Sequence, residues 1–385
     1  HGKSIYFTNS HKRVILCWGC KGMDVYRLKE ELRAVHDPRR EWGNLRHKLV
    51  DILIISLCST ICGGEDFEDM ELFGRERHAW LKTFLELPSG IPDGDTFRRV
   101  LERIDPAELA AVLYSCLEEI KDLSGKTVSI DGKTICGSGS AQHKAYHVVS
   151  AWVSENQMVL GEVVVDKKSN EITVIPRLLD MIDVSGSVVT IDAMGTQTKI
   201  AAKIVEKGAD YVLALKGNHS DLHDDVRFYF ENETISNRFS MREMGHGRQE
   251  LREYFLETKI DWLYGCEKWA GLQAIGAVKS TVTEKGVTRE ETRYFLTSLT
   301  DVKHLARAVR GHWGIENGLH WCLDVIFGED CARMRKERSP LNMNVLRKTA
   351  LALLRKTKVG RMSAKHKMFK AAMNHDFLHL LMFVE

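Results

Sequence analysis

The spacing of hydrophobic residues is helical in the first third of the chain, from residue 42 to about residue 121. Apolar residues recur every three or four positions at 49–57 and again at 109–117, a pattern typical of helices that bury one face. We therefore predict an all-helical N-terminal domain over 23–122. To the preceding segment, 1–22, the pattern assigns no role.

From residue 126 the helical spacing gives way to the alternation of apolar and polar residues that is typical of strands. The predicted elements are strands at 127–132, 146–153, 159–165, 187–192 and 211–215, and helices at 173–182 and 196–207. Three strands joined by hairpins, followed by helix, strand, helix and strand, predict an α/β fold with a mixed five-stranded sheet flanked by helices. This order is that of a ribonuclease H-like core, whose first part we place at 123–235.

A polar, strand-rich stretch follows the predicted sheet. Its strand candidates lie at 251–257, 272–282 and 292–298. We predict a β-rich insertion over 236–300, because glycine-containing turns separate these strands. For the last part, 301–385, we predict a long helix at 302–325 and a basic helical tail.

The charges are unevenly distributed along a chain that is almost neutral overall, with 55 Lys and Arg against 53 Asp and Glu. Residues 1–48 hold 11 basic and 5 acidic residues, residues 331–385 hold 13 and 3, and the part between them is acidic. An acidic centre between basic ends fits a protein that holds metal ions centrally and contacts polyanions with its ends. An uneven solvated surface would give the same asymmetry. The longest apolar stretch, 52–62, is too short to cross a bilayer, so we predict no membrane association.

Two of the predicted strands close on an aspartate, Asp131 and Asp192, and small residues follow each of them. The rim where parallel strands end is the place where open α/β sheets hold their sites. Two neighbouring carboxylates stay ionised together if a cation bridges them, and Mg²⁺ or Mn²⁺ prefers such oxygen ligands. A single strand-end aspartate is more often a turn or cap residue, so the pair carries the prediction of a metal site.

A third acid is expected from a helix beyond the fifth strand, and Glu316 is the best candidate. Helical spacing puts His312, Glu316 and His320 on one face, with Asn317 alongside. The plainer alternative is an exposed helical glutamate beside core tryptophans. Three rival acids follow in the chain: Asp324, Glu329 and Asp330.

Carboxylates around two divalent ions form the arrangement used for in-line phosphoryl transfer. One ion lowers the pKa of a water molecule or of a 3′-hydroxyl, and the other stabilises the leaving oxygen, so no general-base side chain is required. The predicted cofactor is therefore Mg²⁺ or Mn²⁺, bound by Asp131, Asp192 and Glu316.

Five short motifs carry a resemblance to a known family: Ile-Asp-Gly-Lys-Thr at 130–134, Thr-Ile-Asp-Ala-Met-Gly at 190–195, Ala-Leu-Lys-Gly-Asn at 214–218, His-Gly-Arg at 246–248 and His-Trp-Gly-Ile-Glu-Asn at 312–317. The chain resembles the DDE transposases of bacterial insertion sequences, most closely the H-repeat-associated (Rhs-linked) group, from about Met23 to the end. The resemblance implies that Asp131, Asp192 and Glu316 are the catalytic triad of a ribonuclease H-like core. It also implies the helical N-terminal domain and the β-rich insertion.

Polar and basic residues around the predicted site are candidates for binding DNA. The set comprises Lys133, Lys216, Asn218, His246, Arg248, Arg252, Arg310, His312, Asn317, His320, Arg333, Arg335 and Lys336. Lys and Arg contacts to phosphate give an affinity that falls steeply with salt. The wider superfamily has Tyr, Arg and Lys where this chain has Val309, His312 and Leu323, so the phosphate contacts of that signature do not transfer. For any single member, a solvated surface charge is the plainer alternative.

The sequence thus predicts a transposase that nicks DNA and joins 3′-hydroxyl ends to target DNA. The helical domain at 23–122 is a further candidate region for DNA binding. The expected partners are transposon-end DNA and target DNA, and because two ends are cut together we expect a homodimer or larger synaptic assembly. The expected location is the bacterial cytoplasm, in association with the nucleoid. Two alternatives stay open: an inactive DNA-binding remnant of a mobile element, and a ribonuclease H-like nuclease.

Overall fold

The computed structural model describes residues 25–39, 45–117, 122–140, 143–165, 170–245 and 248–383. The chain divides into two compact units, one formed by residues up to 119 together with 345–385, and the other by residues 120–344. The end of the chain therefore belongs to the same unit as the N-terminal helices, whereas our sequence analysis grouped it with the helix of Glu316.

The first unit is helical, as the apolar spacing predicts. Its helices are α1 (Val25–Arg33), α2 (Leu49–Ile61), α3 (Phe67–Glu76), α4 (His78–Leu81), α5 (Gly94–Leu101), α6 (Pro106–Leu117), α13 (Ala364–Met373) and α14 (His375–Met382), with α12 (Ser339–Lys356) crossing the boundary between the units. Helix α2 is apolar on every side and almost wholly buried, because α1, α3, α5, α13 and α14 all pack against it. The side chains of Asp66 and Asp93 cap the first turns of α3 and α5.

The second unit is built on a nine-stranded mixed sheet. Its strands are β1 (Thr127–Ile135), β2 (Tyr146–Val153), β3 (Met158–Val164), β4 (Val188–Ile191), β5 (Asp210–Leu215), β6 (Arg238–Gly245), β7 (Arg248–Glu257), β8 (Ala274–Glu284) and β9 (Val287–Thr297). Across the sheet they follow the order β3-β2-β1-β4-β5-β9-β8-β7-β6. Strands β1, β4 and β5 are parallel, and the other neighbours are antiparallel. The stretch that we predicted as an insertion therefore extends the predicted sheet instead of folding apart from it.

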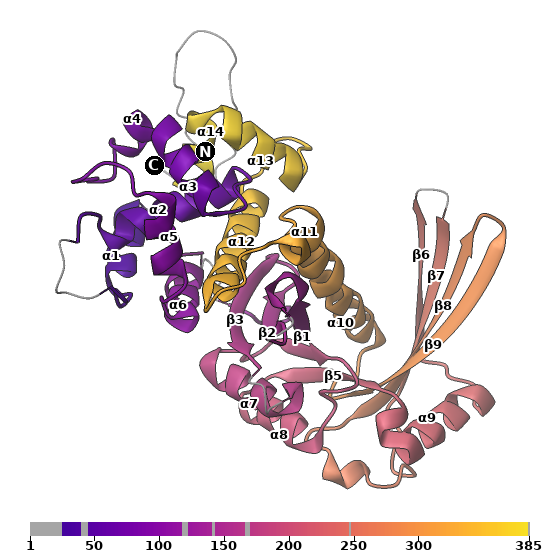
Figure 1. Ribbon diagram of the computed structural model, residues 1–385. Coiled ribbons are helices and arrows are strands. Elements are labelled where there is room, and N and C mark those ends of the chain that lie inside the picture. The colour runs from indigo at the N-terminus through magenta and orange to yellow at the C-terminus, as the bar shows by residue number, and fades with distance from the viewer. Residues whose placement is uncertain are drawn as a thin grey trace, which may run out of the picture. The chain divides into compact units, whose positions relative to one another are not determined.

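Helices cover both faces of this sheet (Figure 1). The helices of the second unit are α7 (Glu171–Met181), α8 (Thr198–Glu206), α9 (Ser220–Asn232), α10 (Val302–Gly314) and α11 (Trp321–Val325). Successive residues of β5 point to opposite faces. Tyr211 and Leu213 join the core beneath α7 and α8, while Val212 joins the core beneath α10. The face under α10 is the one that positions Glu316.

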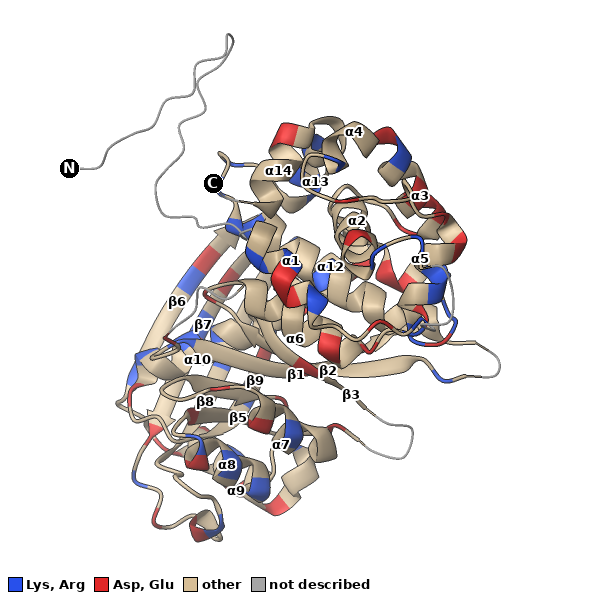
Figure 2. Ribbon diagram, turned by 90° about the vertical axis from the view of Figure 1, so that its left-hand side faces the viewer, with Lys and Arg blue, Asp and Glu red and all other residues tan. Residues whose placement is uncertain are grey.

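Strands β6–β9 form a long, twisted ribbon that continues beyond the helix-covered part of the sheet (Figure 1). Only the last residues of β9, from Tyr294 to Thr297, pair with β5, and the first half of β9 is exposed. Both basic and acidic residues line β6 and β7 (Figure 2). The ribbon is therefore a charged extension of the sheet that solvent reaches.

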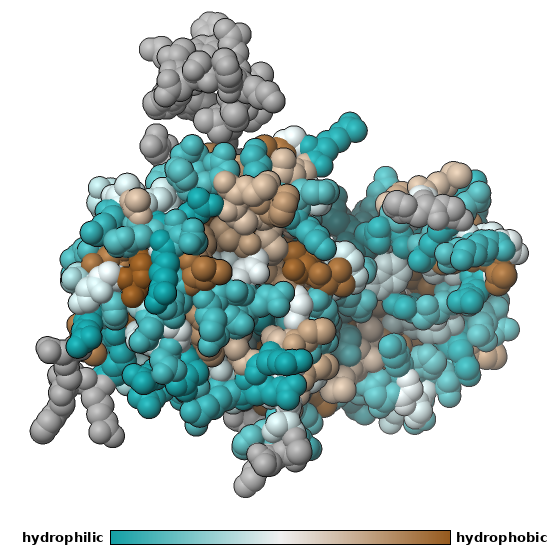
Figure 3. All heavy atoms as spheres, turned by 45° about the horizontal axis from the view of Figure 1, so that its top comes forward, coloured by the Kyte–Doolittle hydropathy of each residue, from teal (hydrophilic) through white to brown (hydrophobic). Residues whose placement is uncertain are grey.

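Exposed apolar side chains are scattered over the molecule. Hydrophilic residues dominate the face shown in Figure 3, and hydrophobic residues there form separate patches. Large exposed apolar residues such as Phe228, Tyr264 and Phe369 lie on different elements, as is usual for folded proteins. Within the ranges that the structure describes, no helix is long and apolar enough to cross a membrane.

Candidate active site

Asp131 and Asp192 lie side by side where the parallel pairing of β1 with β4 ends. The last paired residues are Ile130 and Ile191, and the aspartates are the residues that directly follow them in the chain. Strand β4 stops at that point, but β1 continues beyond Asp131 in its antiparallel pairing with β2. The sequence thus placed both carboxylates correctly at one rim of the parallel ladder, although Asp131 lies inside a longer strand than we predicted.

The neighbourhood of Asp131 disfavours its ionised form. Burial, together with the negative charges of Asp192, Glu171 and Glu316, raises the pKa of Asp131 to about 7. The hydrogen bond that the Gly132 N–H donates to Oδ1, at 2.8 Å, opposes this rise. A nearby cation would stabilise the ionised form of a carboxyl group in these surroundings.

The turn after β4 holds the second aspartate. Oδ1 of Asp192 accepts hydrogen bonds from the N–H groups of Met194 and Gly195, at 3.1 and 3.2 Å. Burial raises the pKa of Asp192, these hydrogen bonds oppose the rise, the charge of Glu171 adds to it, and Lys216 lowers the pKa again. One oxygen of Asp192 is thus fixed by the backbone.

The raised pKa of Asp131 predicts how the stability of the metal-free protein depends on pH. Between about pH 4 and pH 7 the folded protein keeps a proton on Asp131 that the unfolded chain releases, so the free energy of unfolding falls as the pH rises. An Asp131→Asn variant has no group that titrates at this position, so its free energy of unfolding does not show this fall. In urea denaturation it should gain stability relative to the wild type as the pH rises from 5 to 8; a stability difference that stays constant over this range would contradict the assignment.

Glu316 lies in a π-helical segment, η4 (Ile315–His320), between α10 and α11. Such wide turns are rare and often occur at functional sites. Helix α10 lies close to β1 because Gly311 has no side chain: a Cβ there would come 2.8 Å from Cγ2 of Thr127. The Ser154 hydroxyl also donates to the Gly311 carbonyl at 2.7 Å. This close packing brings η4 beside β1, and so brings Glu316 near Asp131.

The three predicted acids are only partly brought together. Among the residues that the structure describes, no three His, Cys, Asp or Glu side chains are placed to hold one metal ion. Glu316 is exposed, and its charge affects the pKa of Asp131 less than those of Asp192 and Glu171 do. Carboxylates without a counter-ion repel one another, which favours a separation between Glu316 and the two aspartates. As oxygen donors at one rim, Asp131, Asp192 and Glu316 nevertheless fit a hard divalent cation.

The wide turn also separates the two histidines that we predicted beside Glu316. His320 Nδ1 lies 3.6 Å from Oδ2 of Asp131, whereas Nδ1 of His312 lies 2.9 Å from the Thr190 hydroxyl. Burial, with the charge of Arg293, lowers the pKa of His312 to about 4. Since its ring is neutral near pH 7 and faces the sheet, we no longer expect His312 to bind DNA as a cation.

Several predicted DNA-binding residues have structural partners. Lys133 is mostly buried, with Nζ 2.7 Å from Oδ1 of Asp324. The Asn218 amide donates to the Ala193 carbonyl at 2.7 Å and so holds the turn after Asp192. Arg335 Nε donates to the Gly137 carbonyl at 3.0 Å, although the residue is exposed. Three other members are also exposed: Lys216, Arg333 and Lys336. His246 lies outside the described residues.

The remaining arginines of the predicted set line a cavity of about 610 Å³ together with Trp313. The Arg252 guanidinium lies 4.6 Å from the centre of the Trp313 ring, and Arg252 and Arg310 both pair with Glu243, at 2.9 and 3.0 Å. Arg252 is only 5 % exposed, so our prediction that it clamps DNA is wrong: it builds the cavity wall. Arg248 and Arg310 are about half exposed, and Asn317 lies at the same cavity.

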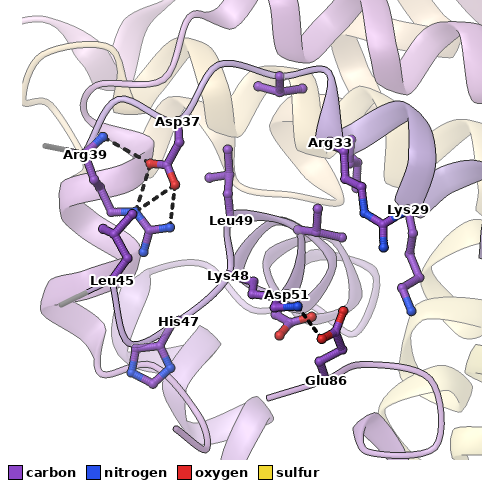
Figure 4. A pocket seen from close by; sticks show the side chains of 13 residues that line it. Lys29, Arg33, Asp37, Arg39, Leu45, His47, Lys48, Leu49, Asp51 and Glu86 are labelled. Carbon is purple, nitrogen blue, oxygen red and sulfur yellow. Dashed lines mark hydrogen bonds and ion pairs between the residues drawn. The ribbon is translucent and has the colours of Figure 1, made fainter. Parts of the chain in front are cut away.

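A second cavity, of about 310 Å³, lies in the helical unit. Figure 4 shows that both basic and acidic side chains line it. Arg39 pairs with Asp37 at 2.6 Å, and Lys48 pairs with Glu86. Since these cations already have acidic partners, the cavity adds no support to our prediction of DNA binding by this unit.

Glu171 and His147 lie beside Gly132, the residue after Asp131, and we did not single them out from the sequence. We predicted that the helix after β3 begins at residue 173, but α7 begins at Glu171. The available signal was Asn170, whose side chain accepts from the Thr173 N–H as an N-cap. Recognising this cap would have placed Glu171 in the first turn of a helix, at the rim that carries the aspartates.

Comparisons with known proteins identify the family. The model of the transposase DDE domain matches residues 122–353, and that of the DDE_Tnp_1-associated region matches residues 29–116. Among curated relatives, "Putative transposase YncI" of Escherichia coli O157:H7 is 37 % identical over 92 % of this chain and 94 % of its own length. The "H repeat-associated putative transposase YhhI" of Escherichia coli K12 is 35 % identical over 92 % of this chain and 97 % of its own length.

A solved structure also aligns with the chain. It is the piggyBac transposase synaptic complex with hairpin DNA, with a TM-score of 0.41, 11 % identity, and coverage of 93 % of this chain and 77 % of the other. That alignment is too loose to inform the geometry of the site. The family model spans the unit that carries the aspartate pair, and the relatives match over nearly their full lengths. The chain therefore belongs to the transposase DDE domain family.

Proposed function

We propose that this protein is an active transposase, which binds transposon ends and catalyses metal-dependent cleavage and strand transfer of DNA in a ribonuclease H-like core. The observation that carries the proposal is the position of Asp131 and Asp192, each directly after the last residue pair of the β1–β4 ladder, with the turn of Glu316 beside β1. Mg²⁺ or Mn²⁺ is the proposed cofactor. A homodimer or larger synaptic assembly on the bacterial nucleoid is the proposed working form.

The residues of the chain have distinct parts in this reaction. Asp131, Asp192 and Glu316 would hold the divalent ions, which would supply charge stabilisation at the attacking and leaving oxygens of a phosphodiester. The backbone N–H groups of Met194 and Gly195 fix one oxygen of Asp192, so this ligand needs little reorganisation. The exposed Lys216 lies near enough to Asp192 to lower its pKa, and it is positioned to bind the scissile phosphate.

The proposed DNA surface uses the exposed part of the predicted set, together with the mostly buried His320. Around the cavity it comprises Arg248, Arg310 and Asn317. Beyond α11 it comprises Arg333, Arg335 and Lys336. Lys216 and His320 belong to it as neighbours of the aspartates.

Removing charge from this surface should weaken DNA binding in a way that depends on salt. The double variant Arg333→Gln/Lys336→Gln is expected to reduce the slope of log affinity against log salt by up to about 2, because each phosphate that a cation neutralises contributes roughly 0.9 to that slope. Fluorescence anisotropy with labelled end DNA at several salt concentrations measures the slope.

A matched control is Lys203→Gln/Lys207→Gln, at the end of α8, which leads back to the start of β5, at the opposite end of the parallel strands from the aspartates. It removes the same charge and should leave the slope unchanged. Equal slopes for the two double variants would rule out the proposed surface.

The proposed activity is tested by incubating the protein with Mg²⁺ and DNA that carries the ends of its element. Nicks with 3′-hydroxyl ends, joined to target DNA, are the expected products. An inactive remnant would bind the ends without cutting them; "Inactive transposase YbfQ" of Escherichia coli K12, 37 % identical over 21 % of this chain, bears such a name. A ribonuclease H-like nuclease would instead cut an RNA–DNA hybrid.

A further inference from the structure

A fourth carboxylate, that of Glu171, lies at the rim that carries Asp131 and Asp192. Glu171 is the first residue of α7, and its side chain is only 15 % exposed. An acidic residue in the first turn of a helix interacts favourably with the helix dipole. The position of Glu171, taken alone, therefore fits a purely structural role. Its hydrogen bonds and its closeness to the aspartates argue for more than that.

His147 holds the Glu171 side chain in one orientation. Nε2 of His147 donates to Oε1 of Glu171 at 2.6 Å, and Nδ1 of the same ring lies 2.9 Å from the Thr134 hydroxyl. Residues His147 and Thr134 are direct partners across β2 and β1. The sheet therefore fixes the ring, and the ring fixes the carboxylate.

Gly132, the residue after Asp131, makes room for this arrangement. A Cβ at Gly132 would come 2.5 Å from Nε2 of His147 and closer still to Oε1 of Glu171. No side chain other than hydrogen fits there without moving the pair. The Glu171 carboxylate thus passes directly over the backbone of the strand that carries Asp131.

Glu171 also acts on both aspartates. Its charge raises the pKa of Asp131 more than that of Glu316 does, and it is the carboxylate that most raises the pKa of Asp192. The main influences on the pKa of Asp192 do not include Glu316. Of the two glutamates, Glu171 is therefore the one coupled most strongly to both members of the pair.

We propose that Glu171, oriented by His147, is a positioning residue of the reaction centre: its negative charge strengthens the hold of Asp131 and Asp192 on a divalent cation. The inference rests on the proposed function, since it concerns the same metal site. Residues around metal ligands typically change metal affinity about 10- to 100-fold when they are replaced, and a carboxylate beside two others adds to the attraction for a cation.

Calorimetric titration of the full-length protein with Mn²⁺ tests this role without relying on activity. Glu171→Gln removes the charge but keeps an oxygen that can accept from His147, and it should weaken Mn²⁺ binding about 10- to 100-fold. Gly132→Ala, which displaces the carboxylate, should weaken binding in the same direction. Glu171→Asp, which restores the charge, should recover part of the affinity.

Glu206→Gln is the matched control, because Glu206 ends α8 near the start of β5, at the opposite end of the parallel strands from the aspartates, and is mostly exposed. It should bind Mn²⁺ as the wild type does. If Glu171→Gln binds Mn²⁺ within about twofold of the wild type while Asp192→Asn loses binding, the role of Glu171 is refuted and the proposed function stands. If the wild type itself binds no Mn²⁺, both proposals fail. A purely structural Glu171 would lower the melting temperature of the metal-free protein without changing Mn²⁺ affinity, which also refutes the inference.

Discussion

Replacing Asp131 or Asp192 with Asn is expected to reduce metal-dependent cleavage of end DNA at least about a thousandfold. Each substitution removes a charged oxygen ligand from the rim where the two strands meet, and metal ions at such sites supply several kcal/mol of transition-state stabilisation. Single-turnover cleavage of labelled end DNA in Mg²⁺ measures the loss. Strand transfer from precut ends should fall in parallel, because it uses the same site.

These variants should keep their fold and their affinity for DNA. Asn preserves the oxygen that accepts from Gly132 in the first case and from Gly195 in the second. Circular dichroism and DNA binding without metal check this expectation, and Glu206→Gln serves as a charge control. Strand transfer at wild-type rates by either aspartate variant would overturn the assignment of the active site.

The second large effect is expected at Glu316. Glu316→Gln should reduce cleavage at least about a hundredfold, because it removes the third carboxylate from the turn beside β1. The rival acid Asp324 is tied to Lys133 at 2.7 Å, so Asp324→Asn should affect activity much less. The two variants remove one charge each, within one short stretch of the chain, and are compared in the same cleavage assay.

Stability measurements distinguish a second rival acid, Glu329, from Glu316 and Asp324. Glu329 is fully buried and accepts a hydrogen bond from Asn344 at 2.8 Å. Replacing a buried, hydrogen-bonded carboxylate destabilises a fold, so Glu329→Gln should lower the melting temperature, whereas Glu316→Gln should not. Full cleavage activity in Glu316→Gln, with loss of activity in Asp324→Asn, would transfer the third position to Asp324.

The elements of the sheet and the aspartate pair were predictable because they depend on local patterns. Alternating apolar residues define β1 to β5, and an acid after each of two strands places Asp131 and Asp192 at one rim once the strands pair in parallel. The alternation could not reveal that β6–β9 join the same sheet, because the pairing of β9 with β5 involves residues far apart in the chain.

The position of the third acid was harder to predict because it depends on helix geometry. A regular helix puts His312, Glu316 and His320 on one face, but the π-helical turn at 315–320 changes that alignment. Nothing in the spacing of apolar residues marks such a turn. The structure consequently brings His320 to Asp131 and turns His312 to the sheet.

Burial of polar residues was the other feature that the sequence could not show. We predicted Arg252 as a cation that contacts DNA, but Glu243, Glu250 and Trp313 enclose it. A buried arginine requires such partners. Glu250 shares β7 with Arg252, but Glu243 comes from β6 and Trp313 from α10, so only the tertiary structure identifies these two.

Anomalous X-ray diffraction from crystals of the protein with end DNA and Mn²⁺ shows where the metal binds. We expect Mn²⁺ peaks between Asp131 and Asp192, with a Glu316 oxygen moved into the coordination sphere and the scissile phosphate beside it. Mn²⁺ bound elsewhere, with DNA at its cleavage point distant from both aspartates, would contradict this expectation.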